Sequence, residues 1–371
     1  MDTCDVLIVG GGPAGSSCAW ALRRAGIDAV VVDRAAFPRD KVCAGWITPQ
    51  VVDELELDVD DYRRGRTFQP FTGFKVGLVG SERMVEAQYG APVSYGIRRC
   101  EFDAYLLCRS GARLALGEPA GSIVHDAGQW IVNDRIRARM LVGAGGHFCP
   151  VARTINPNAA APGARARQLV VAQEAEFEID RGDEAASATN GDTPELYFCR
   201  ELDGYGWRVR KGGYVNVGIG RLDCRSLTRT VAGFVSFLER TGKARAVAGR
   251  RWHGHAYHVS SARRRAVGDA VLLIGDAAGL AWPQSGEGIR PAIQSGLFAA
   301  RTIVDASGRY GRDRLQPYAD WLRRTFNAES RIANALAPLV PASVWMPLAR
   351  TLLGNRAFVR SVVLERGFLR R

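Results

Sequence analysis

The chain has 371 residues, of which 47% are hydrophobic, so it is long enough to bury a large core and is expected to form two intertwined domains. None of its apolar runs is long enough to cross a bilayer. Its eight scattered cysteines include no CxxC pair, which argues against a zinc site or a disulfide framework and predicts a cytoplasmic protein. The formal charge of +12 favours an anionic partner or substrate, although an arginine-rich composition alone explains it equally well. Nucleic acid is not expected, because no recognition motif accompanies the charge.

The start of the chain has the pattern of a dinucleotide-binding unit. A strand over residues 5–10 leads into a glycine-rich segment, a helix from 14 to 25 and a second apolar strand that ends at Asp33. Glycines in the turn let the backbone approach a pyrophosphate, and the helix N-terminus offers free N–H groups to the phosphates. The acidic residue after the second strand accepts hydrogen bonds from ribose hydroxyls. The residues predicted to bind the dinucleotide are Gly10, Gly12, Pro13, Ala14, Gly15, Asp33 and Arg34.

A second segment, over residues 270–300, decides between NAD and FAD. An apolar strand ends at Gly275-Asp276, and a loop then opens a helix rich in small residues. This arrangement resembles the Gly-Asp motif of FAD-binding aromatic hydroxylases, halogenases and geranylgeranyl reductases. The resemblance implies that Asp276 contacts the ribityl chain and that the following helix N-terminus faces the flavin pyrimidine edge, where reduced flavin is negatively charged. It implies cofactor roles for Gly275, Asp276, Pro283, Gly286, Gly288 and Ile289.

Two shorter segments fit the same proteins. Arg99-x-x-Phe102-Asp103 resembles a helix start whose arginine lies near FAD. Residues 139–146 occupy the place of an Ala-Asp-Gly motif, but Gly145 stands where the aspartate is usual and Cys149 where a serine is usual. In hydroxylases that aspartate helps to bind the nicotinamide donor, so its loss disfavours a hydroxylase.

Two further motifs lie outside the FAD core. Residues 37–45 (FPRDKVCAG) resemble the FPRDKxCGG signature of the geranylgeranyl reductase family, and residues 205–212 (YGWRVRKG) resemble its Tyr-x-Trp-x-Phe-Pro-Lys-Gly segment. The chain is therefore similar to this family, within the para-hydroxybenzoate hydroxylase-like superfamily. The resemblance implies that the aromatic segment lies on a substrate sheet facing the flavin. Val209 and Arg210 replace the usual Phe-Pro, which leaves the substrate open. The first motif adds Lys41, Cys43, Ala44 and Gly45 to the predicted cofactor residues.

The catalytic candidates are aromatic residues and one thiol. Reduction of a C=C bond needs a hydride from flavin N5 and a proton from another group, and aromatic rings stabilise positive charge on the reacting carbon. Trp207 and Tyr205 are the first candidates, followed by Trp46, and Cys43 is a candidate proton donor. Each has a structural alternative, because aromatic rings and free cysteines are most often packed core residues.

Strand alternation suggests one site for a charged substrate group. It places Trp207 and Val209 on one face and Arg208 and Arg210 on the other. A bulge at residues 212–213 would instead turn Arg210 toward an anionic head group. Both arrangements remain open from the sequence.

The predicted fold is α/β (α+β overall). A Rossmann-type FAD-binding domain is expected from residues 1–64, 96–164 and 261–314, and an inserted antiparallel substrate sheet from 65–95 and 165–260. A helical segment, 315–371, interleaves apolar residues with arginines. It is interpreted either as a lid over the substrate domain or as a basic surface for peripheral membrane contact.

We expect a flavoenzyme with non-covalent FAD that reduces C=C bonds of an isoprenoid or other apolar unsaturated substrate, with or without an anionic head group. The alternatives are an FAD-dependent monooxygenase or halogenase acting on an aromatic or natural-product substrate, and a non-catalytic flavin-binding redox sensor. The sequence has no second nucleotide-binding unit, so electrons are expected from transiently bound NADPH or NADH, or from a separate reductase protein. No metal is expected, because the cluster His253, His255 and His258 lacks an acidic partner.

Overall fold

The computed structural model describes residues 1–157, 169–179, 191–222, 227–243, 247, 249–258, 265–282, 285–336 and 342–370. The chain forms two compact units: the first comprises Met1–Asp40, Cys100–Gln168 and Tyr257–Asn334, and the second comprises Lys41–Arg99, Leu169–Ala256 and Ala335–Arg371. The predicted mixed α/β class is confirmed. The division differs from the expected one in that residues 41–64 have their contacts in the second unit, and residues 315–334 have theirs in the first.

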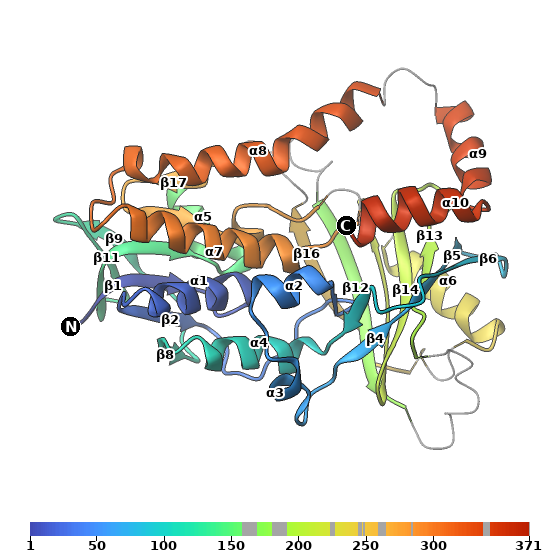
Figure 1. The fold of residues 1–371 in the computed structure, drawn as a ribbon, viewed down its shortest axis with the longest axis horizontal. Coiled ribbons are helices and arrows are strands. Elements are labelled where there is room, and N and C mark those ends of the chain that lie inside the picture. Colours follow the sequence, from blue (N-terminus) through green and yellow to red (C-terminus); the bar gives the residue numbers. More distant parts are fainter. Residues whose placement is uncertain are drawn as a thin grey trace. The chain divides into compact units, whose positions relative to one another are not determined.

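The first unit is built on a mainly parallel sheet (Figure 1). Its central strand, β1, pairs in parallel with β11 on one side and β2 on the other. The apolar run Val6–Val9 is almost completely buried, as expected of a strand covered on both faces. The strands are β1 (Asp2–Val9), β2 (Ala29–Asp33), β8 (Arg113–Leu116), β9 (Ile123–Asp126), β10 (Gln129–Val132), β11 (Ile136–Gly143), β17 (Val267–Gly268) and β18 (Val271–Leu273).

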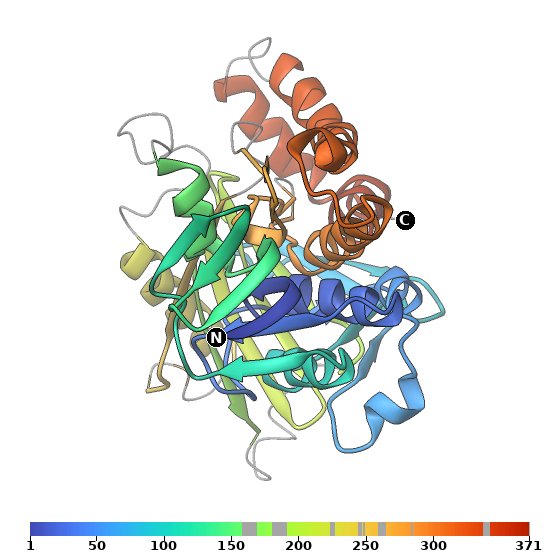
Figure 2. The ribbon, with the colours of Figure 1, turned by 90° about the vertical axis from the view of Figure 1, so that its left-hand side faces the viewer.

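Two helices of the first unit, α1 (Pro13–Arg24) and α7 (Ile289–Asp305), pack side by side (Figure 2). Their backbones approach closely because α7 presents Gly296 to α1. A Cβ at that position would lie 2.3 Å from the Ala14 carbonyl oxygen and 3.1 Å from the Cys18 nitrogen. The other helices that lie wholly or mainly in this unit are α4 (Arg99–Arg109), α5 (Pro150–Ile155) and α8 (Arg312–Leu336).

The second unit contains a seven-stranded sheet in the order β16-β12-β15-β14-β13-β5-β6. Strands β12, β15, β14 and β13 are successively antiparallel, and β13 pairs in parallel with β5. A three-stranded sheet, β3-β7-β4, accompanies it. The strands are β3 (Trp46–Ile47), β4 (Gln69–Phe71), β5 (Gly73–Leu78), β6 (Met84–Gln88), β7 (Ser94–Gly96), β12 (Leu169–Glu178), β13 (Glu195–Phe198), β14 (Gly204–Lys211), β15 (Tyr214–Arg221) and β16 (His253–His258).

The two faces of the large sheet bury different cores. One face packs against helix α6 (Leu227–Arg240) through Phe234 and its apolar neighbours. The opposite face buries an aromatic cluster that contains Trp46, Phe74 and Trp207. Two short helices, α2 (Pro49–Glu54) and α3 (Val59–Arg63), belong to the same unit.

The C-terminal segment of the second unit consists of α9 (Ala342–Leu352), α10 (Arg356–Phe358) and a π-helix over Val359–Phe368. Val359, Leu364 and Phe368 are buried in the aromatic cluster. This packing corresponds to the covering-helix interpretation of the segment, and membrane contact stays a prediction. None of the described helices is long and apolar enough to cross a membrane.

Two helical glycines make a matched test of the α1–α7 contact. We expect Gly296→Ala to destabilise the protein by about 1–3 kcal/mol, because the added methyl overlaps the backbone of α1. Gly233→Ala, in the exposed face of α6 with no neighbour within 4 Å of its added Cβ, should instead stabilise the protein by about 1 kcal/mol. Chemical denaturation of both variants measures the difference, and equal shifts would contradict the packing described.

Candidate functional site: a dinucleotide cradle and an aromatic sheet face

The glycine-rich turn between β1 and α1 packs closely against neighbouring backbone at two of its glycines, Gly10 and Gly15. Gly10 has φ +118°, and a Cβ there would lie 2.3 Å from the Ala144 carbonyl oxygen. A Cβ on Gly15 would lie 1.8 Å from the Gly10 oxygen. Gly12 differs, because its added Cβ would meet only the guanidinium of Arg39, at 3.2 Å. The backbone is therefore tightly packed at Gly10 and Gly15, whereas the space beside Gly12 is open. A pyrophosphate requires this arrangement.

The N-terminus of α1 supplies hydrogen-bond donors to that space. Pro13 occupies the first turn, and the Ser16 N–H donates to the Gly12 carbonyl at 2.9 Å as the first bond of the helix. The N–H groups of Ala14 and Gly15 precede this bond and have no acceptor within the helix. The first turn of α1 carries no acidic residue, so its positive dipole end is available to an anion.

Asp33 ends β2 beside this turn. Its carboxylate accepts hydrogen bonds from the Gly11 N–H at 2.7 Å and from the Ala35 N–H at 2.9 Å. Both bonds fix the carboxylate, and its remaining lone pairs are the acceptors that ribose hydroxyls need. The neighbouring Arg34 is exposed. The predicted residues around Gly12 thus fit a dinucleotide.

The second motif converges on the first within the same unit. Gly275 has φ +58°, and its added Cβ would lie 3.0 Å from the Cβ of Ala14. The Gly275 N–H donates to the Ser295 hydroxyl at 2.9 Å. Both motifs therefore lie next to each other in this unit, as a single FAD site would require.

The loop that leads into α7 contains two glycines, Gly286 and Gly288, whose surroundings restrict larger side chains. A Cβ on Gly286, at φ +67°, would lie 2.4 Å from the Tyr257 hydroxyl. An Asp276 carboxylate oxygen lies 3.4 Å from the position of a Cβ on Gly288, the residue that caps α7. Ile289 begins the helix and is buried. Pro283 lies outside the described residues.

Arg39 is a candidate that the sequence analysis missed. Its guanidinium stacks over the Phe37 ring at 4.7 Å and pairs with Asp103 at 3.3 Å. Asp103 is completely buried. Both contacts hold a positive charge beside Gly12, where the phosphates of a dinucleotide are expected. In the sequence, Arg39 belongs to the FPRDK motif and Asp103 to the Arg-x-x-Phe-Asp motif. Their pairing could not be predicted, because only the fold brings the two motifs together. Arg99 itself is buried at the start of α4.

The two departures in the Ala-Asp-Gly region are neighbours in space. A Cβ on Gly145 would lie 3.3 Å from both Cβ and Sγ of Cys149, which is completely buried. A side chain at 145 would therefore require Cys149 to shift by a few tenths of an ångström, so the two replacements are coupled through their packing.

The FPRDK loop continues into the second unit, where it is bound to the large sheet. Lys41 is hydrogen-bonded to His255 of β16. The Cys43 carbonyl accepts from the Asn216 side chain at 3.3 Å, and the Ala44 carbonyl accepts from Lys211 Nζ at 3.1 Å. Among the described residues, no group of three His, Cys, Asp or Glu side chains is arranged to hold a metal ion.

Gly45 completes the attachment of this loop. It has φ +70°, and its added Cβ would lie 2.4 Å from the Ile97 carbonyl oxygen and 2.5 Å from Lys211 Nζ. The Ile97 N–H donates to the Gly45 carbonyl at 2.8 Å. Only glycine fits both the backbone angle and the space.

Lys211 is the central charge of this region, with a side-chain exposure of 0%. Its Nζ lies 2.5 Å from Glu176, which also accepts from Arg98 Nε at 3.0 Å. Asn216 donates to the same carboxylate at 3.2 Å. Lys211, Arg98 and Asn216 together lower the pKa of Glu176 against the effect of its burial.

Trp207 lies flat over a glycine. Trp207, Gly218 and Glu174 are successive cross-strand partners on β14, β15 and β12, so they share one face of the sheet. A Cβ on Gly218 would lie 2.2 Å from the indole ring of Trp207. The indole Nε1 donates to Asn216 Oδ1 at 2.7 Å.

Glu174 is a second candidate that the sequence analysis missed. Its residue exposure is 6%, and its Oε2 has no hydrogen-bond partner. Burial raises the pKa of Glu174 to about 7, whereas the Cys43 N–H, Lys211 and Asn216 act in the opposite direction. The signal in the sequence was Glu174-Ala-Glu176, two carboxylates on the same face of a strand that also carries apolar residues.

The aromatic candidates lie in the cluster on this face. Trp46 contacts Phe74 and Phe368, with ring centroids 6.1 and 6.2 Å apart. Tyr205 lies 6.0 Å from Trp207 and 5.1 Å from Phe368. The structure thus brings Trp46, Tyr205 and Trp207 together.

Arg210 stays on the opposite face. Lys211 pairs with Tyr214 in a regular hairpin, so the bulge that would turn Arg210 is not formed. Its Nε donates to the Gly212 carbonyl at 3.3 Å. The cation on the Trp207 face is Lys211.

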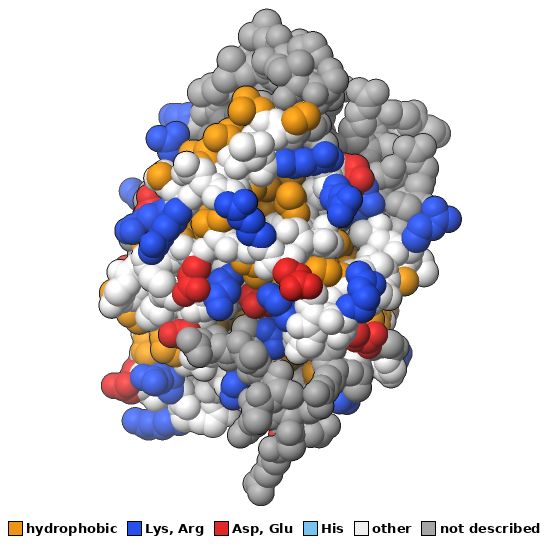
Figure 3. Space-filling view, turned by 90° about the vertical axis from the view of Figure 1, so that its right-hand side faces the viewer, with side chains coloured by type: hydrophobic (Ala, Val, Ile, Leu, Met, Phe, Trp, Pro, Cys, Tyr) orange, Lys and Arg blue, Asp and Glu red, His pale blue; other side chains and the backbone are white. Residues whose placement is uncertain are grey.

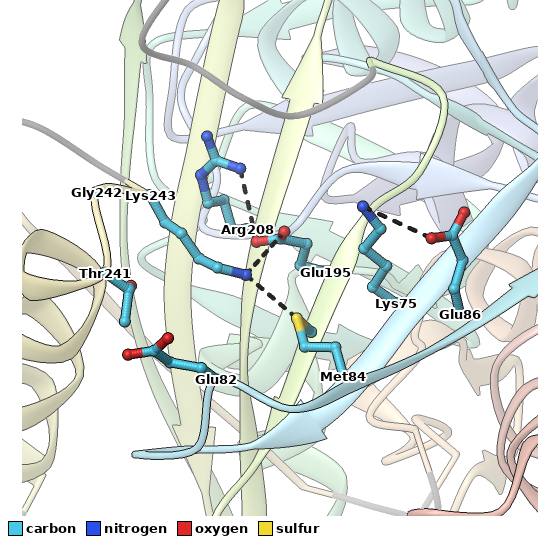
Figure 4. A pocket seen from close by; sticks show the side chains of 9 residues that line it. All are labelled: Lys75, Glu82, Met84, Glu86, Glu195, Arg208, Thr241, Gly242 and Lys243. Atoms are coloured by element: carbon cyan, nitrogen blue, oxygen red, sulfur yellow. Dashed lines mark hydrogen bonds and ion pairs between the residues drawn. The ribbon is translucent and has the colours of Figure 1, made fainter.

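A separate pocket of about 370 Å³ lies on the face that carries Arg208 (Figure 4). Its charges are largely paired with one another. Glu195 lies 3.1 Å from Lys243 and 3.6 Å from Arg208, and Lys75 lies 3.7 Å from Glu86. We interpret this pocket as a charge-paired hollow of the sheet.

Comparison with known proteins identifies FAD-binding relatives. A family profile described as an FAD binding domain matches residues 3–57. A menaquinone reductase of Mycobacterium tuberculosis is 32% identical over 376 residues, covering 90% of this chain and 84% of that protein. A digeranylgeranylglycerophospholipid reductase of Methanopyrus kandleri is 28% identical over 366 residues, covering 91% and 90%.

The fold has a counterpart among solved structures. A geranylgeranyl bacteriochlorophyll reductase-like protein from Thermoplasma acidophilum matches with a TM-score of 0.76 and 20% identity, covering 99% of this chain and 97% of that chain. At 20% identity this likeness shows the fold, and the sequence relatives confirm the predicted family: the chain belongs to the geranylgeranyl reductase family of FAD-dependent oxidoreductases.

Proposed function

We propose that the protein reduces C=C bonds in the isoprenoid chain of a lipid substrate, with non-covalently bound FAD as the hydride donor. The observation that carries this proposal is the aromatic cluster around Trp46, Tyr205 and Trp207 on one face of the large sheet. Such a surface suits a long apolar chain and offers rings to a carbon on which positive charge builds up.

The names of the relatives support the same substrate class. One is a reductase of menaquinone, a quinone with a prenyl side chain, and the other a reductase of digeranylgeranylglycerophospholipid. Both substrates are lipids that carry isoprenoid double bonds. Their polar head groups differ, so the feature that the two substrates share is the isoprenoid chain.

The residues around the glycine-rich turn of residues 10–15 have defined roles in this proposal. The bound flavin supplies hydride from N5 when it is reduced. The N–H groups at the start of α1 and the guanidinium of Arg39 bind the pyrophosphate. Asp33 accepts from the ribose hydroxyls, and Asp276 is assigned to the ribityl chain. The aromatic cluster excludes water from the reacting double bond.

The monooxygenase or halogenase alternative is less favoured by the geometry at Gly145. Cys149 packs closely against this glycine and would have to shift for the aspartate that hydroxylases use toward the nicotinamide donor. A redox sensor without turnover is the other alternative.

The source of electrons is proposed as NADPH, NADH or a separate reductase protein.

Peripheral membrane contact is a further part of the proposal, because a lipid substrate is delivered from a membrane. The C-terminal segment exposes Leu348 (50%) and Val362 (42%). Arg350, Arg356 and Arg360 lie in the same segment. Figure 3 shows exposed apolar side chains together with basic and acidic ones on one face of the molecule. Arginine beside exposed apolar groups suits an anionic bilayer surface.

Flavin binding can be tested at Gly12. We expect the wild-type protein to purify yellow and to release FAD into the supernatant on acid precipitation. Gly12→Val should fold normally but lose the flavin, because its side chain fills the space before the helix and meets only Arg39. Gly213→Ala, at an exposed hairpin position with no neighbour within 4 Å, is the control and should retain FAD. A folded, yellow Gly12→Val protein would show that the phosphates bind elsewhere.

The reaction can be tested without knowing the electron donor. The flavin is reduced anaerobically with dithionite, the excess is removed, and geranylgeranyl diphosphate, whose only reducible groups are its double bonds, is added. We expect reoxidation of the flavin without oxygen and a product heavier by two hydrogens per reduced bond, measured by absorbance and mass spectrometry. Reoxidation that occurs only with oxygen and inserts an oxygen atom would select the monooxygenase. A reduced flavin that no substrate reoxidises would select the sensor.

A further inference from the structure

One buried acid on the aromatic face, Glu174, is only partly satisfied by its neighbours. Glu176 on the same strand is fully engaged by Lys211, Arg98 and Asn216. Glu174 is more deeply buried, yet its Oε2 has no hydrogen-bond partner. A carboxyl group in this position costs free energy unless it is protonated or compensated.

The position of Glu174 links three parts of the candidate site. Its strand register places it beside Gly218 and in line with Trp207, on the face of the aromatic cluster. The Cys43 N–H donates a hydrogen bond to its carboxyl group, which attaches it to the FPRDK loop. Ala172, two residues earlier on the same strand face, belongs to the aromatic cluster.

We propose that Glu174 is the proton donor that completes reduction of the double bond. This inference rests on the proposed function. One alkene carbon receives hydride from the reduced flavin, and the π electrons of the double bond form a new C–H bond with the proton of Glu174 at the other carbon. The flavin is oxidised by two electrons and the alkene is reduced, while the Glu174 carboxylate regains a proton from solvent.

The charges around Glu174 suit an acid that works near neutral pH. Burial raises the pKa to about 7, and the negative charge of Glu176 acts in the same direction. Lys211, the Cys43 N–H and Asn216 limit the rise, and Arg98 pairs with the neighbouring Glu176. The protonated form is therefore present below pH 7 and is lost as the pH rises through that value.

The first test uses Glu174→Gln, which keeps the shape but removes the proton. Wild-type protein reduced with dithionite should be reoxidised by the prenyl substrate at a rate that falls as the pH rises through about 7. Glu174→Gln should bind FAD with an unchanged spectrum and be reduced normally, but its reoxidation rate should drop about 100-fold or more and lose this inflection. Glu178→Gln, at the exposed end of the same strand, is the control and should behave like wild type.

A second measurement does not depend on turnover. The carbonyl band of a protonated carboxyl group should titrate near pH 7 in infrared difference spectra of wild-type protein and Glu178→Gln, and be missing in Glu174→Gln. A raised folded-state pKa stabilises the fold at low pH, and this contribution is lost as the pH rises through the folded-state pKa. The melting temperature of Glu174→Gln relative to wild type should therefore increase between pH 5 and pH 8.

The outcomes separate the inference from the proposed function. If wild-type protein reduces the prenyl chain and Glu174→Gln does so at an equal rate with the same inflection, Glu174 is not the donor and the proposed function stands. If Cys43→Ala removes the inflection and Glu174→Gln keeps it, the thiol is the donor. If no unsaturated substrate reoxidises wild-type protein, the proposed function fails, and an absent carboxyl band near pH 7 would overturn the buried acid independently.

Discussion

The close contact between helices α1 and α7 is the constraint on which the cofactor cradle depends. Gly296 lets the backbone of α7 approach Ala14 of α1, and Gly275 approaches the same alanine from the preceding turn. Two segments that are far apart in the sequence thereby bring both their glycine turns into one unit. A dinucleotide needs phosphate donors and ribose acceptors at fixed separation, so this packing is a condition for binding and not merely for stability.

A second constraint acts in the sheet unit, where buried Lys211 takes the place of a hydrophobic core residue. Its ammonium group is compensated by Glu176 and by the Ala44 carbonyl. Because a buried charge without partners is costly, the lysine attaches the loop of residues 41–47 to the sheet. The same loop presents the Cys43 N–H to Glu174. The Lys211–Glu176 ion pair therefore orders the loop of residues 41–47 and determines the surroundings of Glu174.

Much of the fold was predictable because it depends on local patterns. Consecutive apolar residues ending in glycine identified β1, and alternation identified the faces of β14. Arg39 and Glu174 were not predictable in this way. Arg39 pairs with Asp103 of another segment, and Glu174 lies beside Gly218, which the indole of Trp207 covers. Such roles arise from cross-strand and inter-helix neighbours, which a single sequence does not encode as a motif.

The departures from the family motifs fall where they change chemistry and leave the fold intact. Gly145 and Cys149, which stand where an aspartate and a serine are usual, pack against each other in the first unit, and Cys149 is completely buried. Val209 replaces a phenylalanine within the aromatic cluster, which removes a ring but keeps an apolar side chain. Arg210 replaces a proline on the face away from Trp207, where the regular hairpin tolerates a charged residue. Val209 is completely buried two residues from Trp207, so the replacement changes the packing beside that indole while keeping its surroundings apolar.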